Sequence, residues 1–95
     1  MVRLNWTNQA VEDLNDIAEY IAKDSIKYSK IQILRIRERA RLLKNNPLLG
    51  RVVPEINQNN IRELIFKNYR IIYKIVDELR VDILFIYHSS RLLPR

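Results

Sequence analysis

The stretch from Ile61 to Arg91 constrains the fold most, because its apolar residues alternate with the two-residue period of a half-buried β-strand. Near its centre, the expected strand carries Tyr69, Ile71, Tyr73 and Ile75 on one face, and Arg70, Ile72, Lys74 and Val76 on the other. Two short polar turns divide the stretch. We therefore predict three consecutive strands.

A three-residue loop over 77–79 fixes how the last two of these strands pair. The expected cross-strand pairs are Tyr73–Ile83, Ile71–Phe85, Lys74–Asp82 and Arg70–Ile86. On the last strand this register places Val81, Ile83, Phe85 and Tyr87 on one face and Asp82, Leu84, Ile86 and His88 on the other. The prediction is a sheet with one apolar face for the core and a second, open face where Arg70 lies near His88.

The residues before this stretch predict a helical hairpin. A short strand over 2–6 precedes Thr7, a typical N-cap residue, and the first helix is expected to end near Lys23. Its outward residues are expected to include Asp13 and other acids. Asp24 and Ser25 break this helix and cap a second one over about 26–45.

The expected apolar stripe of the second helix is Ile26, Ile33, Ile36, Ala40 and Leu43, widened by Ile31, Leu34 and Leu42. After it, Pro54 restricts the segment 51–56 to a short edge strand or an extended loop. The predicted fold class is α+β: a two-helix antiparallel hairpin packed on one face of a mostly antiparallel sheet of four to five strands, in β-α-α-β-β-β order.

Composition narrows the possible functions. The chain has 95 residues, which we expect to form a single domain over 1–95. It has no cysteine and one histidine, and no nucleotide-binding or zinc motif, so we expect no metal and no cofactor. No apolar run is long enough to span a membrane, and a cytoplasmic location is expected. The net charge of +6 favours an anionic partner.

Four residues are candidates for a functional site. Arg70 can bind a phosphate, or it can pair structurally with Glu63 across the sheet. His88 can transfer a proton or can be a hydrogen-bonded residue at a strand end. The sheet face on which Arg62 lies depends on whether the turn at 67–68 has two or three residues; with three, Arg62 and Arg70 share the open face. Arg91 follows the last strand. Together, arginines and a histidine suit an RNA-cleaving site, with Glu63 as the only evident carboxylate base.

Four blocks of the sequence resemble the RelE/ParE superfamily of toxins from type II toxin–antitoxin systems. They are WTNQAVEDLNDIAEYIA, PLLGRVVPE, IRELIFKNYRIIYKI and VDILFIYHSSRLL, in that order along the chain. The resemblance implies a small toxin neutralised by a cognate acidic antitoxin in a heteromeric complex. ParE-like members poison DNA gyrase, whereas RelE-like members cut mRNA on the ribosome.

Three segments look more ParE-like than RelE-like: the tryptophan–threonine start, the GRVVPE segment and the HSSR ending. By the RelE pattern, Arg70 and Arg91 match arginines of the cleavage site, and His88 can replace a missing group. The RelE-like lysine pair near 61–63 and the tyrosine after Arg91 are absent, with Arg62 the only base at the former place. We therefore expect a gyrase-poisoning toxin. A ribosome-dependent mRNA endoribonuclease using Arg70, His88, Arg62 and Arg91, or an inactive antitoxin-binding relative, are the alternatives.

Overall fold

The computed structural model describes residues 1–88 of the chain. The elements are β1 (Arg3–Trp6), α1 (Asn8–Ala22), α2 (Ile26–Arg41), the 3-10 turn η1 (Leu42–Lys44), β2 (Arg51–Val52), β3 (Ile61–Phe66), β4 (Tyr69–Ile75) and β5 (Arg80–His88). The five strands form one sheet in the order β1-β5-β4-β3-β2. β1 runs parallel to β5 and every other pair is antiparallel, so the predicted α+β class is confirmed.

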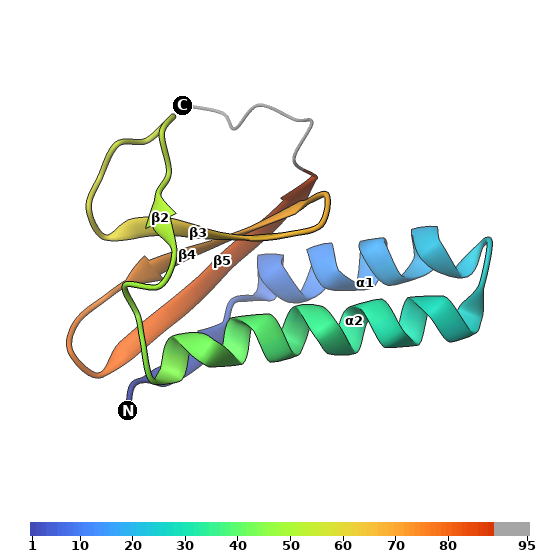
Figure 1. The fold of residues 1–95 in the computed structure, drawn as a ribbon, viewed down its shortest axis with the longest axis horizontal. Helices are drawn as coiled ribbons and strands as arrows, with labels where there is room; N and C mark the ends of the chain where they lie inside the picture. Colours follow the sequence, from blue (N-terminus) through green and yellow to red (C-terminus); the bar gives the residue numbers. More distant parts are fainter. Residues whose placement is uncertain (89–95) are drawn as a thin grey trace.

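The helical hairpin begins and turns where the sequence predicts. The Thr7 hydroxyl accepts a hydrogen bond from the amide of Ala10, and the Ser25 hydroxyl accepts one from the amide of Tyr28. The antiparallel helices lie together on one side of the sheet, and their connecting end projects past the strands (Figure 1). The second helix is shorter than predicted, because residues 42–44 continue as a 3-10 turn.

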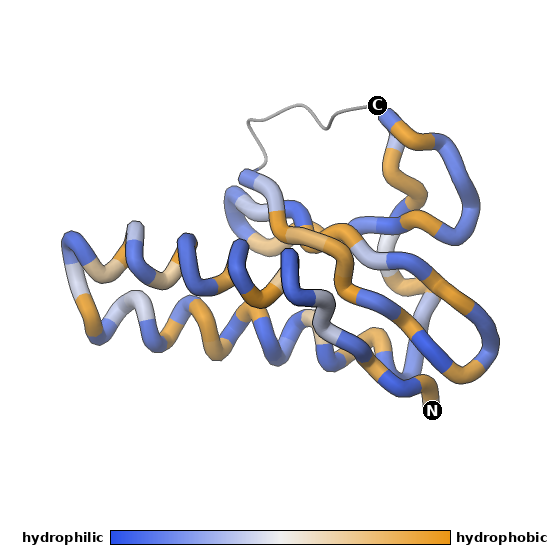
Figure 2. The backbone as a smooth tube through the Cα atoms, turned by 180° about the vertical axis from the view of Figure 1, so that it is seen from behind, coloured by the Kyte–Doolittle hydropathy of each residue, from blue (hydrophilic) through white to orange (hydrophobic). Residues whose placement is uncertain are grey.

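The main core fills the space between the hairpin and the sheet. Its buried members are Val2, Ala10, Leu14, Ile36, Ala40, Leu43, Leu64, Ile71, Tyr73, Val81, Ile83 and Ile86. In Figure 2 the apolar colour runs along the strands, whereas it alternates with polar residues along both helices. The predicted widening of the second helical stripe is wrong, because Ile31, Leu34 and Leu42 are exposed, as is Ile26.

A bulge in β5 changes the predicted register. Tyr73 pairs with Ile83 and Lys74 with Asp82, as expected, but beyond this point Ile72 pairs with Phe85. Leu84 is therefore an extra residue, which moves every later side chain of β5 to the opposite face. The predicted pairs Ile71–Phe85 and Arg70–Ile86 are wrong; the observed pairs are Ile71–Ile86, Arg70–Tyr87 and Tyr69–His88.

The start of α1 holds this irregular region of β5. The Thr7 hydroxyl donates toward the carbonyl oxygens of both Ile83 and Leu84, at 2.7 and 2.9 Å. Farther along, where β1 has ended, the carboxylate of Asp13 accepts a hydrogen bond from the Ile86 amide at 2.9 Å. The prediction that Asp13 simply faces solvent is therefore wrong. The helix supplies the partners that an edge of the sheet would otherwise lack.

The second face of the sheet is not open, contrary to the prediction. The segment between β2 and β3 folds over it and forms a smaller core of Val53, Ile61 and Ile72. Partly buried side chains of Ile56, Leu84, Phe85 and Tyr87 pack against this cluster. Figure 1 shows the segment as a loop beside β2 and β3 at the end of the sheet away from the hairpin tip. It carries Glu55 to the place where Arg70 emerges from β4.

Candidate functional site

Arg70 lies at the centre of a buried ion-pair network on the second sheet face. Its Nε donates to Oε1 of Glu63 at 2.6 Å, and its two terminal nitrogens donate to both carboxylate oxygens of Glu55 at 2.7 and 2.9 Å. The other oxygen of Glu63 accepts from Nε of Arg51, also at 2.6 Å. The Glu63 side chain is fully buried and that of Arg70 is 8% exposed. Of the two alternatives for Arg70, the structure shows the pairing with Glu63 across the sheet.

Two carboxylates balance two guanidinium groups in this network, so its formal charge is zero. The hydrogen bonds that Arg70 donates to Glu55, followed by the bond to Glu63, raise the pKa of Arg70 above its ordinary value despite burial. A phosphate that approached Arg70 would have to replace a bidentate carboxylate contact, the strongest geometry a guanidinium makes. The network therefore fastens the 53–56 segment to β4 and leaves little of Arg70 for a ligand.

Arg62 lies on the opposite face of the sheet from Arg70. The turn at Lys67 and Asn68 has two residues, because Phe66 pairs with Tyr69, and this register pairs Arg62 with Tyr73. The guanidinium of Arg62 donates to the backbone oxygens of Gly50 and Asn59 and to the Asn59 side chain, at 2.9–3.0 Å. These contacts hold two loops together. The three-residue turn, which would have placed Arg62 on the same sheet face as Arg70, is excluded.

Gly50 lies beside this anchor, where no larger residue fits. A Cβ at position 50 would come within 2.4 Å of the Glu63 carbonyl oxygen and 2.7 Å of the Tyr73 hydroxyl. That hydroxyl accepts from the Gly50 amide and donates to the Pro47 carbonyl, at 2.9 and 2.7 Å. Tyr73 thus joins the main core to the loop that leads into β2. Burial raises the pKa of Tyr73 above its ordinary value of 10.0.

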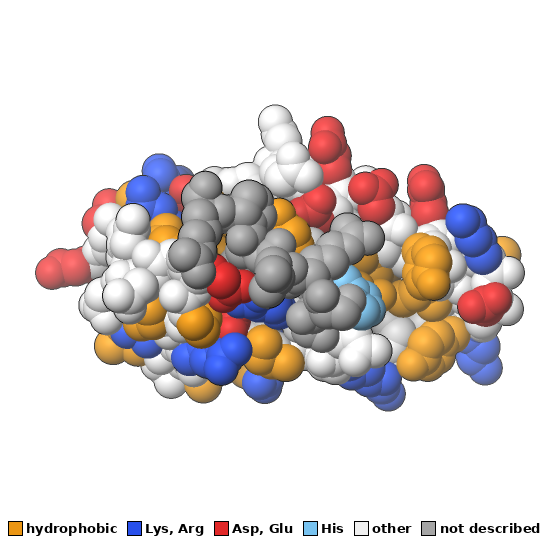
Figure 3. All heavy atoms as spheres, turned by 90° about the horizontal axis from the view of Figure 1, so that it is seen from above, with side chains coloured by type: hydrophobic (Ala, Val, Ile, Leu, Met, Phe, Trp, Pro, Cys, Tyr) orange, Lys and Arg blue, Asp and Glu red, His pale blue; other side chains and the backbone are white. Residues whose placement is uncertain are grey.

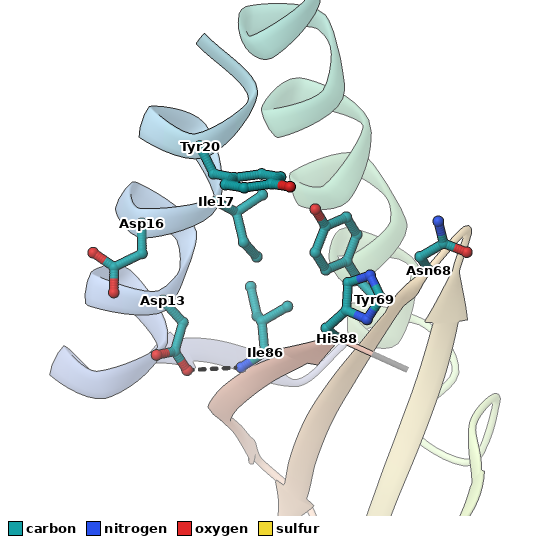
Figure 4. A pocket seen from close by; sticks show the side chains of 8 residues that line it. All are labelled: Asp13, Asp16, Ile17, Tyr20, Asn68, Tyr69, Ile86 and His88. Atoms are coloured by element: carbon teal, nitrogen blue, oxygen red, sulfur yellow. Dashed lines mark hydrogen bonds between the residues drawn. The ribbon is translucent and has the colours of Figure 1, made fainter. Parts of the chain in front are cut away.

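His88 lies on the helix side of the sheet, because the bulge at Leu84 shifts it there. Its ring meets the ring of Tyr69 edge-on, with the centroids 5.6 Å apart. Both line a groove of about 740 Å³ between α1 and the ends of β4 and β5 (Figure 4). The lining residues are Asp13, Asp16, Ile17, Tyr20, Asn68, Tyr69, Ile86 and His88. The sequence prediction that placed His88 on one face with Arg70 is wrong.

The polar side chains that line the groove are two tyrosines, two aspartates, Asn68 and His88. In Figure 4 the side chains of Tyr20 and Tyr69 point toward each other. Burial, together with the neighbouring Tyr20 and Tyr28, raises the pKa of Tyr69 above its ordinary value, so this phenol is protonated at neutral pH. Asp13 already accepts from the backbone of β5. Of the two groove aspartates, Asp13 is therefore engaged in holding the fold.

The structure does not bring the four predicted site residues together. Arg70 lies on one sheet face, Arg62 and His88 lie on the other in different surroundings, and Arg91 lies outside the described residues. Within residues 1–88, no cluster of three or more His, Cys, Asp or Glu could hold a metal ion. The same residues contain no helix that is long and apolar enough to cross a membrane.

Sequence reasoning missed two members of the network, Arg51 and Glu55. Glu55 follows Pro54 in an irregular segment, where neither strand nor helix periodicity assigns a face. The signal that could have found it was its negative charge in a chain where Lys and Arg outnumber the acids.

Comparisons with known proteins agree with this architecture. The family model for the ParE toxin of the type II toxin–antitoxin system parDE matches residues 4–93. A search of curated proteins gives no significant match. Among solved structures the chain is similar to one described as the chromosomal ParDE TA system from P. aeruginosa, with a TM-score of 0.76 and 21% identity, over 93% of this chain and 96% of that one. At this identity the structural likeness supports the fold, and the family model supports membership. The chain therefore belongs to the ParE toxin family of type II toxin–antitoxin systems.

Proposed function

We propose that this ParE-family toxin inhibits growth by poisoning DNA gyrase in the cytoplasm, and that a cognate acidic antitoxin neutralises it in a heteromeric complex. The main support for a mechanism without RNA cleavage is the hydrogen bonding of Arg70. Three of its donors are committed to Glu55 and Glu63. Cleavage of RNA would need a cation at the phosphate and an acid or base beside it.

The separation of the candidate residues supports the same choice. His88 and Arg62 lie on the helix side of the sheet, whereas Arg70 lies on the side covered by residues 53–56. The catalytic roles of Arg70, His88, Arg62 and Arg91 remain a prediction that belongs to the ribosome-dependent alternative. Membership of the ParE family does not favour that alternative.

The target can be identified by what accumulates after the toxin is induced. We expect gyrase to be trapped covalently on cleaved DNA. With purified gyrase, supercoiled plasmid and ATP, the toxin should yield linear DNA after detergent treatment, and omission of gyrase is the control. Messenger RNA cuts in phase with codons, without trapped gyrase, would refute the proposal and favour the ribosome as target.

The antitoxin can be tested in the same cells by co-expressing the open reading frame next to the toxin gene. We expect its product to restore growth and to co-purify with the toxin. An anionic product would fit the toxin's net charge of +6. If no neighbouring product restores growth, the proposed antitoxin is wrong.

A further inference from the structure

The groove of about 740 Å³ between α1 and the ends of β4 and β5 has no assigned role so far, and we call it the α1 groove. Aromatic rings line two of its sides: Tyr20 reaches it from α1, and Tyr69 and His88 reach it from the sheet (Figure 4). Tyr20 is 69% exposed, so its ring adds little to the core. An exposed ring beside a hollow is typical of surfaces that bind a partner.

The α1 groove also carries a negative charge for which the fold supplies no cation. Within residues 1–88, three of the four acids that are not exposed form ion pairs with arginines: Glu55, Glu63 and Asp82. The fourth is Asp13, which accepts hydrogen bonds from two neutral donors, the Ile86 amide at 2.9 Å and the side-chain amide of Gln9 at 2.8 Å. An ionised carboxylate has about four acceptor sites, so Asp13 retains the capacity to bind a cation.

A second carboxylate reinforces this charge. Asp16 follows Asp13 by about one turn of α1 and is exposed at the rim of the groove, and no Lys or Arg of the described residues forms an ion pair with it. The whole of α1 contains four acids and no Lys or Arg. Figure 3 shows acidic side chains along one long edge of the molecule, with hydrophobic side chains beside them toward the hairpin end. This edge therefore attracts cations, although the chain as a whole is cationic.

Aromatic rings next to carboxylates select a guanidinium group. A guanidinium is planar, so it stacks on an aromatic face while its N–H groups donate to a carboxylate. The ring of Tyr20 already attracts one cation, since the ammonium of Lys23 lies 5.9 Å from its centroid. A nucleotide would also stack on these rings, but its phosphate would be repelled by Asp13 and Asp16.

We propose that the α1 groove binds an arginine side chain on the surface of the toxin's protein target. This inference rests on the proposed gyrase-directed function, to which it adds a contact site and the chemistry of recognition. The guanidinium lies between Tyr20 and Tyr69, and Asp13 and Asp16 compensate its charge. The groove is larger than one side chain, so it also admits part of the segment that carries the arginine.

Direct binding of a small probe is the first measurement. N-acetyl-arginine amide is titrated into the purified toxin and followed by two-dimensional amide NMR. N-acetyl-citrulline amide is the control ligand, because citrulline has the shape of arginine without its charge. We expect the arginine probe to shift the signals of Tyr20, Asn68 and Tyr69 and to bind about tenfold more tightly than the citrulline probe. Equal affinity for the two probes would overturn the inference.

The second measurement compares variants by the amount of gyrase that they trap on cleaved plasmid. Asp16→Asn and Tyr20→Leu change exposed side chains, so circular dichroism should show the double variant folded. It should require about tenfold more toxin for the same yield of linear DNA, and it should bind the arginine probe about tenfold more weakly. Glu12→Gln is the matched control, since Glu12 is an exposed acid of α1 that does not line the groove. It should act as the wild type does.

The results also separate this inference from the proposed function. If the double variant traps gyrase as well as the wild type does, the inference is wrong and the proposed function stands. If Glu12→Gln weakens trapping as much as the double variant, the general charge of α1 is responsible and the groove has no specific role. If spermine binds the groove on the order of 100-fold more tightly than the arginine probe while the double variant still traps gyrase, the ligand is a free polyamine and the inference is overturned. If the wild type traps no gyrase, the proposed function fails and the inference fails with it.

Discussion

Replacing Arg70 with alanine separates a structural role from a catalytic one. In the structure its guanidinium makes three hydrogen bonds of 2.6–2.9 Å to two carboxylates. The variant would remove the bidentate partner of Glu55, and it would leave the fully buried Glu63 to pair with the largely exposed Arg51. Removing one member of a buried ion pair costs about 3–5 kcal/mol, mostly because the remaining charge is poorly solvated.

That loss is large for a chain of this size. A domain of 95 residues is stable by about 5–14 kcal/mol at ~0.05–0.15 kcal/mol per residue. Each kcal/mol changes the melting temperature of such a domain by about 4–8 °C, so we expect Arg70→Ala to lower it by at least ~12 °C. The 53–56 segment should also loosen, because the bond that fastens it to β4 is gone.

Urea unfolding followed by far-UV circular dichroism measures the free energy directly. Arg35→Ala is the control, since Arg35 is exposed on α2, and it should stay within about 0.5 kcal/mol of the wild type. A double-mutant cycle with Glu63→Ala should give a coupling of about 1–3 kcal/mol. If Arg70→Ala unfolds at the same free energy as the wild type but is no longer toxic, the structural role is refuted. Arg70 would then be a residue that contacts the target.

Three further changes test other parts of the structure. Gly50→Ala should destabilise the protein by about 1–3 kcal/mol in thermal unfolding, because its Cβ would lie 2.4 Å from the Glu63 carbonyl oxygen; an unchanged melting temperature would contradict this. Gln32→Met should instead stabilise it by about 1–3 kcal/mol, since both amide atoms of Gln32 are buried without a partner among the described residues; a loss of stability would reveal a hidden partner. Tyr73→Phe should cost about 1–3 kcal/mol through the lost bonds to Pro47 and Gly50. Because the folded state raises the pKa of Tyr73, the unfolded chain loses its proton first, and stability should fall as pH rises through 10.0, less steeply in the Phe variant.

Local patterns predicted much of this fold. Side-chain capping preferences located the helix starts at Thr7 and Ser25, and strand periodicity located β4 and its pairing with β5 near Tyr73. The helical stripes were less reliable. Because α2 has apolar residues on both its inner and outer sides, periodicity placed the exposed Ile26 in the same stripe as the core-facing Ile36 and widened that stripe to the exposed Leu34.

The bulge in β5 explains why the candidate site was harder to predict than the fold. From Ile83 to Tyr87 every residue is apolar or aromatic, so the sequence contains no polar alternation that marks an extra residue. The structure places that residue at Leu84. There the hydroxyl of Thr7 donates toward the carbonyl oxygens of Ile83 and Leu84. Tertiary contact with α1, which a strand pattern does not contain, stabilises the irregularity.

The same bulge decides which chemistry the sheet can carry. In a regular β5, His88 would emerge on the sheet face that also carries Arg70 and Glu63, so a cation, a carboxylate and an imidazole would share one surface. The extra residue turns His88 toward Tyr69 and the groove beside α1, and Glu55 then completes the neutral network around Arg70. Consequently, neither face of the sheet carries the cation, the carboxylate and the imidazole together. The helical hairpin is one exposed surface, and its two helices carry opposite charge. The arrangement of these side chains is therefore consistent with the proposed gyrase-directed mechanism, in which the toxin cleaves no phosphate itself.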